Sequence, residues 1–143
     1  MSAPNYPQAE AFLHALDPEA DAFTFQTFDD NNDRRNPALA KIFSGSFERH
    51  REALTAFNER GAGIYVTVNE TDGEGRKNSN IVRVRAIWQE DDGDGKGQLP
   101  LEPHIVVNTS PGKYHRYWLV DIHVICGTID GVYEVVPENR TVV

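Results

Sequence analysis

The sequence has too few cysteines and too few long apolar runs for several classes of protein. Its one cysteine, Cys126, excludes an internal disulfide bond and a cysteine-based zinc site. No apolar run approaches the roughly 20 residues that span a membrane. The segment Met1–Pro7 has neither the basic region nor the apolar core of a secretory signal. We therefore expect a protein of the reducing cytoplasm that makes no membrane contact.

Positive charge is also scarce. Lysine and arginine number 14 against 22 aspartates and glutamates, which gives a net charge of −8 at pH 7. A protein that coats nucleic acid would normally be basic, so the charge argues against that class. An enzyme that acts on nucleic acid remains open, because Arg and Lys can gather in one cleft while metal-binding acids lower the total.

The length of 143 residues and the 39% content of hydrophobic residues predict one globular domain, residues 1–143. Apolar residues recur at helical spacing over Pro7–Leu16 and over Ser46–Arg60. Ser46 is a suitable N-cap for the second helix, and Gly61 stands where a helix-ending glycine belongs.

A run of strands is predicted from alternating or clustered β-branched and aromatic residues. The predicted strands are Phe23–Phe28, Gly63–Val68, Ile81–Gln89, His104–Thr109 and Arg116–Val120, with one or two more in Ile122–Val143. In the first of them, Thr24 and Gln26 are expected to point away from the core. This order of elements predicts an α+β fold, a largely antiparallel sheet with flanking helices.

Three consecutive acids follow the strand Ile81–Gln89. Because side chains alternate along a strand, Glu90 and Asp92 should share the face of Trp88, while Asp91 points the other way. Two carboxylates projecting together can bind Mg²⁺ or Mn²⁺. An acid pair at a strand end is more often only a solvated turn, so the spacing alone leaves both interpretations open. Trp88 and Trp118 are expected to pack in the core.

The segment Ser110–His115 joins the last two of these strands and carries Lys113 and His115. If the strand that follows is a sheet neighbour of the strand ending in Glu90, the cations and the acids would line one cleft. Cations there would suit triphosphate oxygens. The same segment is equally consistent with an ordinary β-turn, because proline and glycine are the expected residues of such turns.

Together these segments resemble the RepB-like DNA primase domain of plasmid, phage and prophage replication proteins, which belongs to the archaeo-eukaryotic primase, or primase-polymerase, superfamily. The resemblance covers residues 20–121. The segments that carry it are Phe25–Asp30, Gly63–Gly73, Val84–Gly93, Pro103–Val107 and Ser110–Trp118.

The resemblance implies a primase-like catalytic core that transfers nucleotides from nucleoside triphosphates onto a primer or first nucleotide. It implies a single-stranded DNA template, a replication helicase or initiator as partner, and a phage or plasmid gene in a prokaryotic cytoplasm. Glu90 and Asp92 stand at the acid-x-acid motif that holds two Mg²⁺ or Mn²⁺ ions, and His115 matches the catalytic histidine. The implied nucleotide-binding residues are Ser110, Lys113, His115, Asn69, Thr71 and Arg76.

The family's third acidic motif has no matching segment after Asp121. Asp121 is expected to replace it as a metal ligand, with Asp130 and Glu134 as further candidates, and Ile122–Val143 forms a divergent, shortened tail. One alternative is therefore a catalytically inactive domain that binds nucleotides, single-stranded DNA or a replication partner. Another is an interaction domain in which the acidic loop is only a solvent-exposed turn at the end of a strand. Open strand edges in a shortened domain would favour a dimer.

Overall fold

The computed structural model describes residues 4–94, 100–125 and 128–135, and for residues 124–125 and 128–135 it describes the main chain. The helices are α1 (Tyr6–Leu16) and α2 (Phe47–Glu59), with short 3₁₀ turns at Pro37–Leu39 and Asn78–Asn80. The strands are β1 (Phe23–Asp29), β2 (Lys41–Gly45), β3 (Ala62–Val66), β4 (Glu70–Thr71), β5 (Ile81–Asp91), β6 (Ile105–Ser110), β7 (Lys113–Ile125) and β8 (Thr128–Val135). Neither helix in these ranges is long and apolar enough to cross a membrane.

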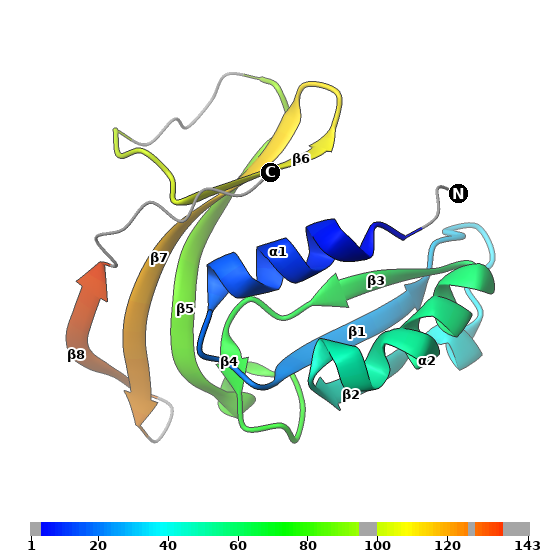
Figure 1. Cartoon of the computed structure of the whole chain (residues 1–143), viewed down its shortest axis with the longest axis horizontal. Coiled ribbons are helices and arrows are strands. Elements are labelled where there is room, and N and C mark those ends of the chain that lie inside the picture. The colour runs from blue at the N-terminus through cyan, green and yellow to red at the C-terminus, as the bar shows by residue number, and fades with distance from the viewer. Residues whose placement is uncertain (1–3, 95–99, 126–127, 136–143) are drawn as a thin grey trace.

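The strands form two antiparallel sheets instead of the single sheet expected from the sequence. The first has the order β2-β1-β3, and the second has the order β4-β5-β7-β6, with β8 also paired to β7. The long strands β5 and β7 curl the second sheet into a half-barrel, and α1 crosses its concave side (Figure 1). The α+β class and the antiparallel pairing are confirmed.

Both predicted helices are confirmed, and local hydrogen bonds explain where they begin. Asn5 caps α1, where its Oδ1 accepts a hydrogen bond from the backbone N–H of Gln8 at 3.1 Å. The Ser46 hydroxyl caps α2 by accepting from the backbone N–H of Arg49 at 3.1 Å. Gly61, just past the end of α2, has a φ of 98°, a left-handed conformation that glycine adopts without steric cost.

Removal of the Ser46 cap should lower the free energy of unfolding. We expect Ser46→Ala to cost about 1 kcal/mol, because the Arg49 N–H loses its acceptor. Urea unfolding measures the difference. Ser79→Ala is the matched control, since Ser79 is an exposed serine outside the regular helices. Equal midpoints for the two variants would show that the hydroxyl does not cap α2.

The core lies where α1 meets both sheets. Leu13 and Leu16 of α1 are buried together with Phe25 of β1 and Leu119 of β7. From the same helix, the ring of Phe12 meets the ring of Tyr117 edge-on, with centroids 5.3 Å apart. Helix α2 contributes Leu54 to the core and packs against the first sheet. Helix α1 therefore fixes the half-barrel against the first sheet.

The outer face of β1 differs from the prediction. Thr24 and Gln26 do alternate with the core-facing phenylalanines, but both are buried instead of solvated. The Thr24 hydroxyl is 2.7 Å from that of Thr71, because β4 lies across this face. The Gln26 amide donates to the carbonyl of Lys41 at 3.2 Å. Polar side chains on this face are buried because they find partners there.

The two tryptophans have different environments. Trp118 is buried, and its indole N–H donates to the carbonyl of Leu101 at 3.0 Å, as predicted for a core residue. Trp88 is 50% exposed, so its predicted burial is wrong. Ala86 faces Leu119 in the core, and Trp88 lies two residues further along β5. Burial in this strand thus depends on contacts with the rest of the chain, which the residue type cannot reveal.

Candidate functional site

The acids at the end of β5 lie beside the start of β7. In the antiparallel register Glu90 is opposite His115, and Asp91 is opposite Tyr114. The hairpin between β6 and β7 turns at Pro111 and Gly112, where Gly112 has a φ of 75°. The turn is shorter than predicted, so Lys113 and His115 project from a strand.

Two ion pairs cross from β5 to β7 on one face. The Nε2 atom of His115 is 3.7 Å from Oε1 of Glu90, and the Nζ atom of Lys113 is 3.3 Å from Oδ1 of Asp92. The side chains of Glu90 and Asp92 are 59% and 61% exposed. Pairs this open contribute little to stability, and their charged atoms remain accessible to a ligand.

Asp91 faces the other way, as the alternation predicted. Its Oδ2 accepts from Nη1 of Arg116 at 2.5 Å, and its Oδ1 accepts from the backbone N–H of Gly93 at 2.9 Å. The hydrogen bond from Arg116 and then that from Gly93 lower the pKa of Asp91. Asp91 is therefore ionised at neutral pH and fixes the strand end that carries Glu90 and Asp92.

The side chains here suit a divalent cation whose remaining ligands come from the oxygens of a bound phosphate. Glu90 and Asp92 offer the hard carboxylate oxygens that Mg²⁺ and Mn²⁺ prefer. Within the described ranges, no group of three or more His, Cys, Asp or Glu side chains could hold a metal ion. Magnesium is commonly held by one or two carboxylates together with substrate phosphates, so two acids suit such a site.

Asp121, predicted as a third metal ligand, does not lie near the acid pair. Its Oδ1 is 3.5 Å from Nη1 of Arg83 and 3.5 Å from Nε2 of His123. Asp121 lies six residues beyond His115 on β7, roughly 20 Å at the usual rise of a strand. A shared strand face thus does not make the two residues neighbours. The side chains of Asp130 and Glu134 lie outside the described part of the chain.

The predicted nucleotide-binding residues divide into two groups. Ser110 pairs with Lys113 in the hairpin beside the ion pairs. The other three lie in or next to β4, away from the hairpin, where they contact the first half of β5 or strand β1. Asn69 accepts from the backbone N–H of Arg85, Thr71 contacts Thr24, and the Arg76 guanidinium is 5.8 Å from the ring centroid of Phe28. The structure does not bring these three to Glu90 and His115.

Two aromatic residues next to the ion pairs were not predicted as part of the site. The ring centroids of Trp88 and His115 are 5.5 Å apart, and Tyr117 lies directly opposite Trp88 on β7. Burial raises the pKa of Tyr117, so this phenol stays neutral at physiological pH. The alternation along β5 had already placed Trp88 on the face of Glu90, but the tryptophan was assigned to the core.

A second charged cluster joins α1 to β5 at the opposite end of the half-barrel. Asp17, which ends α1, pairs with Arg83 and accepts from Nε of Arg85 at 2.8 Å. The Nε atom of Arg83 also donates to Oε2 of Glu70 at 2.6 Å. Burial opposes ionisation of Asp17, but the two arginines outweigh it and lower its pKa.

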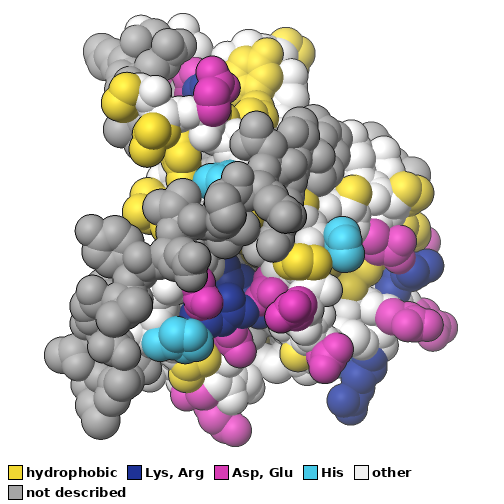
Figure 2. All heavy atoms as spheres, turned by 60° about the vertical axis from the view of Figure 1, so that its left-hand side comes forward, with side chains coloured by type: hydrophobic (Ala, Val, Ile, Leu, Met, Phe, Trp, Pro, Cys, Tyr) yellow, Lys and Arg dark blue, Asp and Glu magenta, His cyan; other side chains and the backbone are white. Residues whose placement is uncertain are grey.

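These side chains line a polar cavity of about 630 Å³, and Figure 2 shows positive side chains enclosed by acidic ones on this face. Arg83 and Arg85 already have carboxylate partners, and the ion pairs of Asp17 with these two arginines connect the end of α1 to β5. It is therefore a structural feature and not the candidate site.

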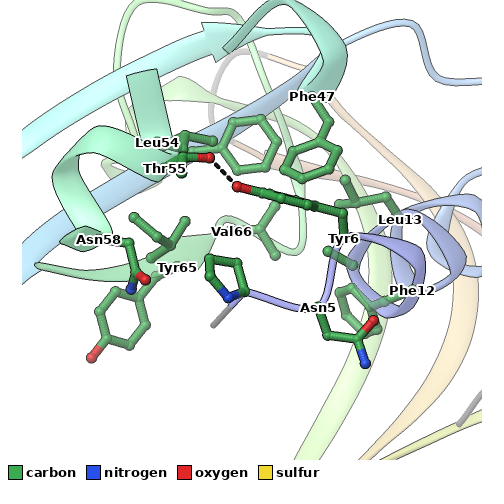
Figure 3. A pocket seen from close by; sticks show the side chains of 14 residues that line it. Asn5, Tyr6, Phe12, Leu13, Phe47, Leu54, Thr55, Asn58, Tyr65 and Val66 are labelled. Atoms are coloured by element: carbon green, nitrogen blue, oxygen red, sulfur yellow. Dashed lines mark hydrogen bonds between the residues drawn. The ribbon is translucent and has the colours of Figure 1, made fainter. Parts of the chain in front are cut away.

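An apolar cavity of about 310 Å³ lies between α1, α2 and β3. In Figure 3 the rings of Tyr6, Phe12 and Phe47 surround it, and the Tyr6 hydroxyl hydrogen-bonds to that of Thr55. None of the described residues that line this cavity carries a charged side chain. Its described lining therefore holds no carboxylate, imidazole or amino side chain of the kind that the ends of β5 and β7 present.

Comparisons of the chain with protein-family models, with curated proteins and with solved structures find no match.

Proposed function

We propose that the chain is a primase-polymerase-like domain, with its nucleotide and metal site at the paired ends of β5 and β7. It would transfer nucleotides from nucleoside triphosphates onto a primer or first nucleotide, guided by a single-stranded template. One observation carries the proposal. The direct pairing of Glu90 with His115 sets two carboxylates, a histidine and a lysine on one open face. The resemblance of the same segments to RepB-like primase domains supports it.

Each side chain has a role that its chemistry suits. Glu90 and Asp92 would hold Mg²⁺ or Mn²⁺, which neutralises phosphate charge and orients the reacting groups when bound. Lys113 and His115 would contact the triphosphate oxygens as negative charge builds. Lys113 lies 3.3 Å from Asp92, and His115 lies 3.7 Å from Glu90. Exposed pairs of this kind exchange partners at little free-energy cost.

A second candidate function is nucleotide binding without transfer. Among the described residues around His115, two acids, Glu90 and Asp92, face the site, and Asp121 does not join them. The absence of a third acid there favours this second candidate. Such a domain would bind a nucleoside triphosphate together with a metal ion, or single-stranded DNA, and would incorporate nothing.

Primer synthesis and extension on a single-stranded template, with Mg²⁺ or Mn²⁺, test the proposal. We expect the wild type to incorporate nucleotides and His115→Asn to lose roughly 10²- to 10³-fold in rate, the usual effect of removing one charge-stabilising group. His123→Asn is the matched control, because His123 lies on the same strand, is exposed and pairs with Asp121.

Equal rates for the two variants and the wild type would show that His115 has no part in the reaction. Metal-dependent nucleotide binding by a wild type that incorporates nothing would support the second candidate.

A further inference from the structure

Trp88 presents an exposed aromatic ring beside His115, one of the two residues proposed to contact phosphate. Its side chain extends from β5 on the face that carries Glu90, and the residue is 50% exposed. Its centroid lies 5.5 Å from that of His115 and 6.5 Å from that of Tyr117, to which it is inclined by 30°. Single exposed apolar side chains are common, but this ring packs against two others and so has a defined orientation.

The side chains along this face follow an order. Trp88 and Tyr117 form the first cross-strand pair, Glu90 and His115 form the second, and beyond them Lys113 approaches Asp92. Successive pairs are two residues apart, about 6.6 Å along a strand. An aromatic surface is thus followed by charged groups in one line. A ligand that matches this order has a flat ring at one end and several phosphates at the other.

We propose that Trp88 is the stacking platform for the nucleobase of the incoming nucleoside triphosphate. This inference rests on the proposed function and adds the residue that would position the base. The phosphates would then lie toward His115 and Lys113. Stacking depends on the flat face of a base and not on its hydrogen-bond pattern, so purines and pyrimidines should both be accepted.

Isothermal titration with ATP and with inorganic tripolyphosphate, each in the presence of Mn²⁺, separates the base from the phosphates. We expect Trp88→Ala to weaken ATP binding roughly 5- to 150-fold, the usual range for one stacked base, and to leave tripolyphosphate binding unchanged. Trp88→Phe should keep most of the ATP affinity. Ile87→Ala is the control, because Ile87 is 54% exposed on the opposite face of the same strand, and it should change neither affinity.

Unchanged ATP binding by Trp88→Ala would overturn the stacking role and leave the proposed function standing. An equal loss of ATP and tripolyphosphate would also overturn it, since the ring would then support the site and not the base. A wild type that binds ATP no more tightly than tripolyphosphate would do the same. Trp88-dependent ATP binding by a protein that incorporates nothing would support the stacking role and count against nucleotidyl transfer.

Discussion

Replacing Glu90 with Gln and Asp92 with Asn in one chain should abolish metal-dependent nucleotide incorporation. The amides are close in shape to the carboxylates, but they lack the negative charge that holds a divalent cation. Metal stabilisation of transition-state charge is worth several kcal/mol, so the loss should be roughly 10³-fold or more. A primer-extension time course with Mg²⁺ or Mn²⁺ measures it.

The double variant should remain folded, because both side chains are largely exposed and their ion pairs contribute little stability. A thermal midpoint near that of the wild type would show this. Asp121→Asn is the matched control, since Asp121 pairs with Arg83 away from the site, and it should keep wild-type activity. Full activity in the double variant would refute the metal site, and loss of activity in Asp121→Asn would restore Asp121 to it.

The largest effect on stability is expected from Asp17. We expect Asp17→Ala to lower the free energy of unfolding by about 3–5 kcal/mol, the usual cost of breaking a buried ion pair. Arg85 is 3% exposed and would keep a buried charge without its carboxylate partner, whereas Arg83 would retain Glu70. Urea denaturation measures the loss. Asp21→Ala, an exposed acid at the same cavity, should change stability by less than about 0.5 kcal/mol.

Arg85→Met in the Asp17→Ala background should recover part of the lost stability, because the unpaired charge is then gone. If Asp17→Ala and Asp21→Ala lower the free energy of unfolding equally, the ion pairs of Asp17 do not stabilise the contact between α1 and β5.

The ion pairs of Asp17 also make the free energy of unfolding depend on pH in the acid range. Arg85 and Arg83 lower the pKa of Asp17 below 3.8 in spite of burial, so the unfolded chain takes up the proton first as the pH falls. The stabilisation is therefore complete well above pH 3.8 and is lost as the pH falls through the lower pKa of the folded state. In the wild type the free energy of unfolding should drop below pH 4 more steeply than in Asp17→Ala. Parallel acid limbs would contradict this assignment.

Local sequence signals predicted the helices and the facing of side chains. Helix α2 begins after Ser46 and ends before Gly61, and both bounds depend on interactions between residues close together in the sequence. Alternation also selected Glu90 and Asp92 over Asp91 without knowledge of the fold.

Features that depend on distant partners were not predictable. The pairing of β5 with β7, and not with β6, decides whether His115 meets Glu90. The contact of Asp17 with Arg85 spans 68 positions in the sequence. β2 was missed because Lys41–Gly45 is short and contains Ser and Gly, although its Phe43 is buried. Trp88 was assigned to the core because residue type cannot show which part of a strand is covered.

Titration of Mn²⁺ together with ATP into the wild type and into the double variant at Glu90 and Asp92 shows whether these two acids hold the metal ion that strengthens nucleotide binding. We expect the wild type to bind ATP with an affinity that rises when Mn²⁺ is present, and the variant to lose that rise. A variant that keeps the full Mn²⁺-dependent affinity would show that the paired ends of β5 and β7 are not the nucleotide and metal site.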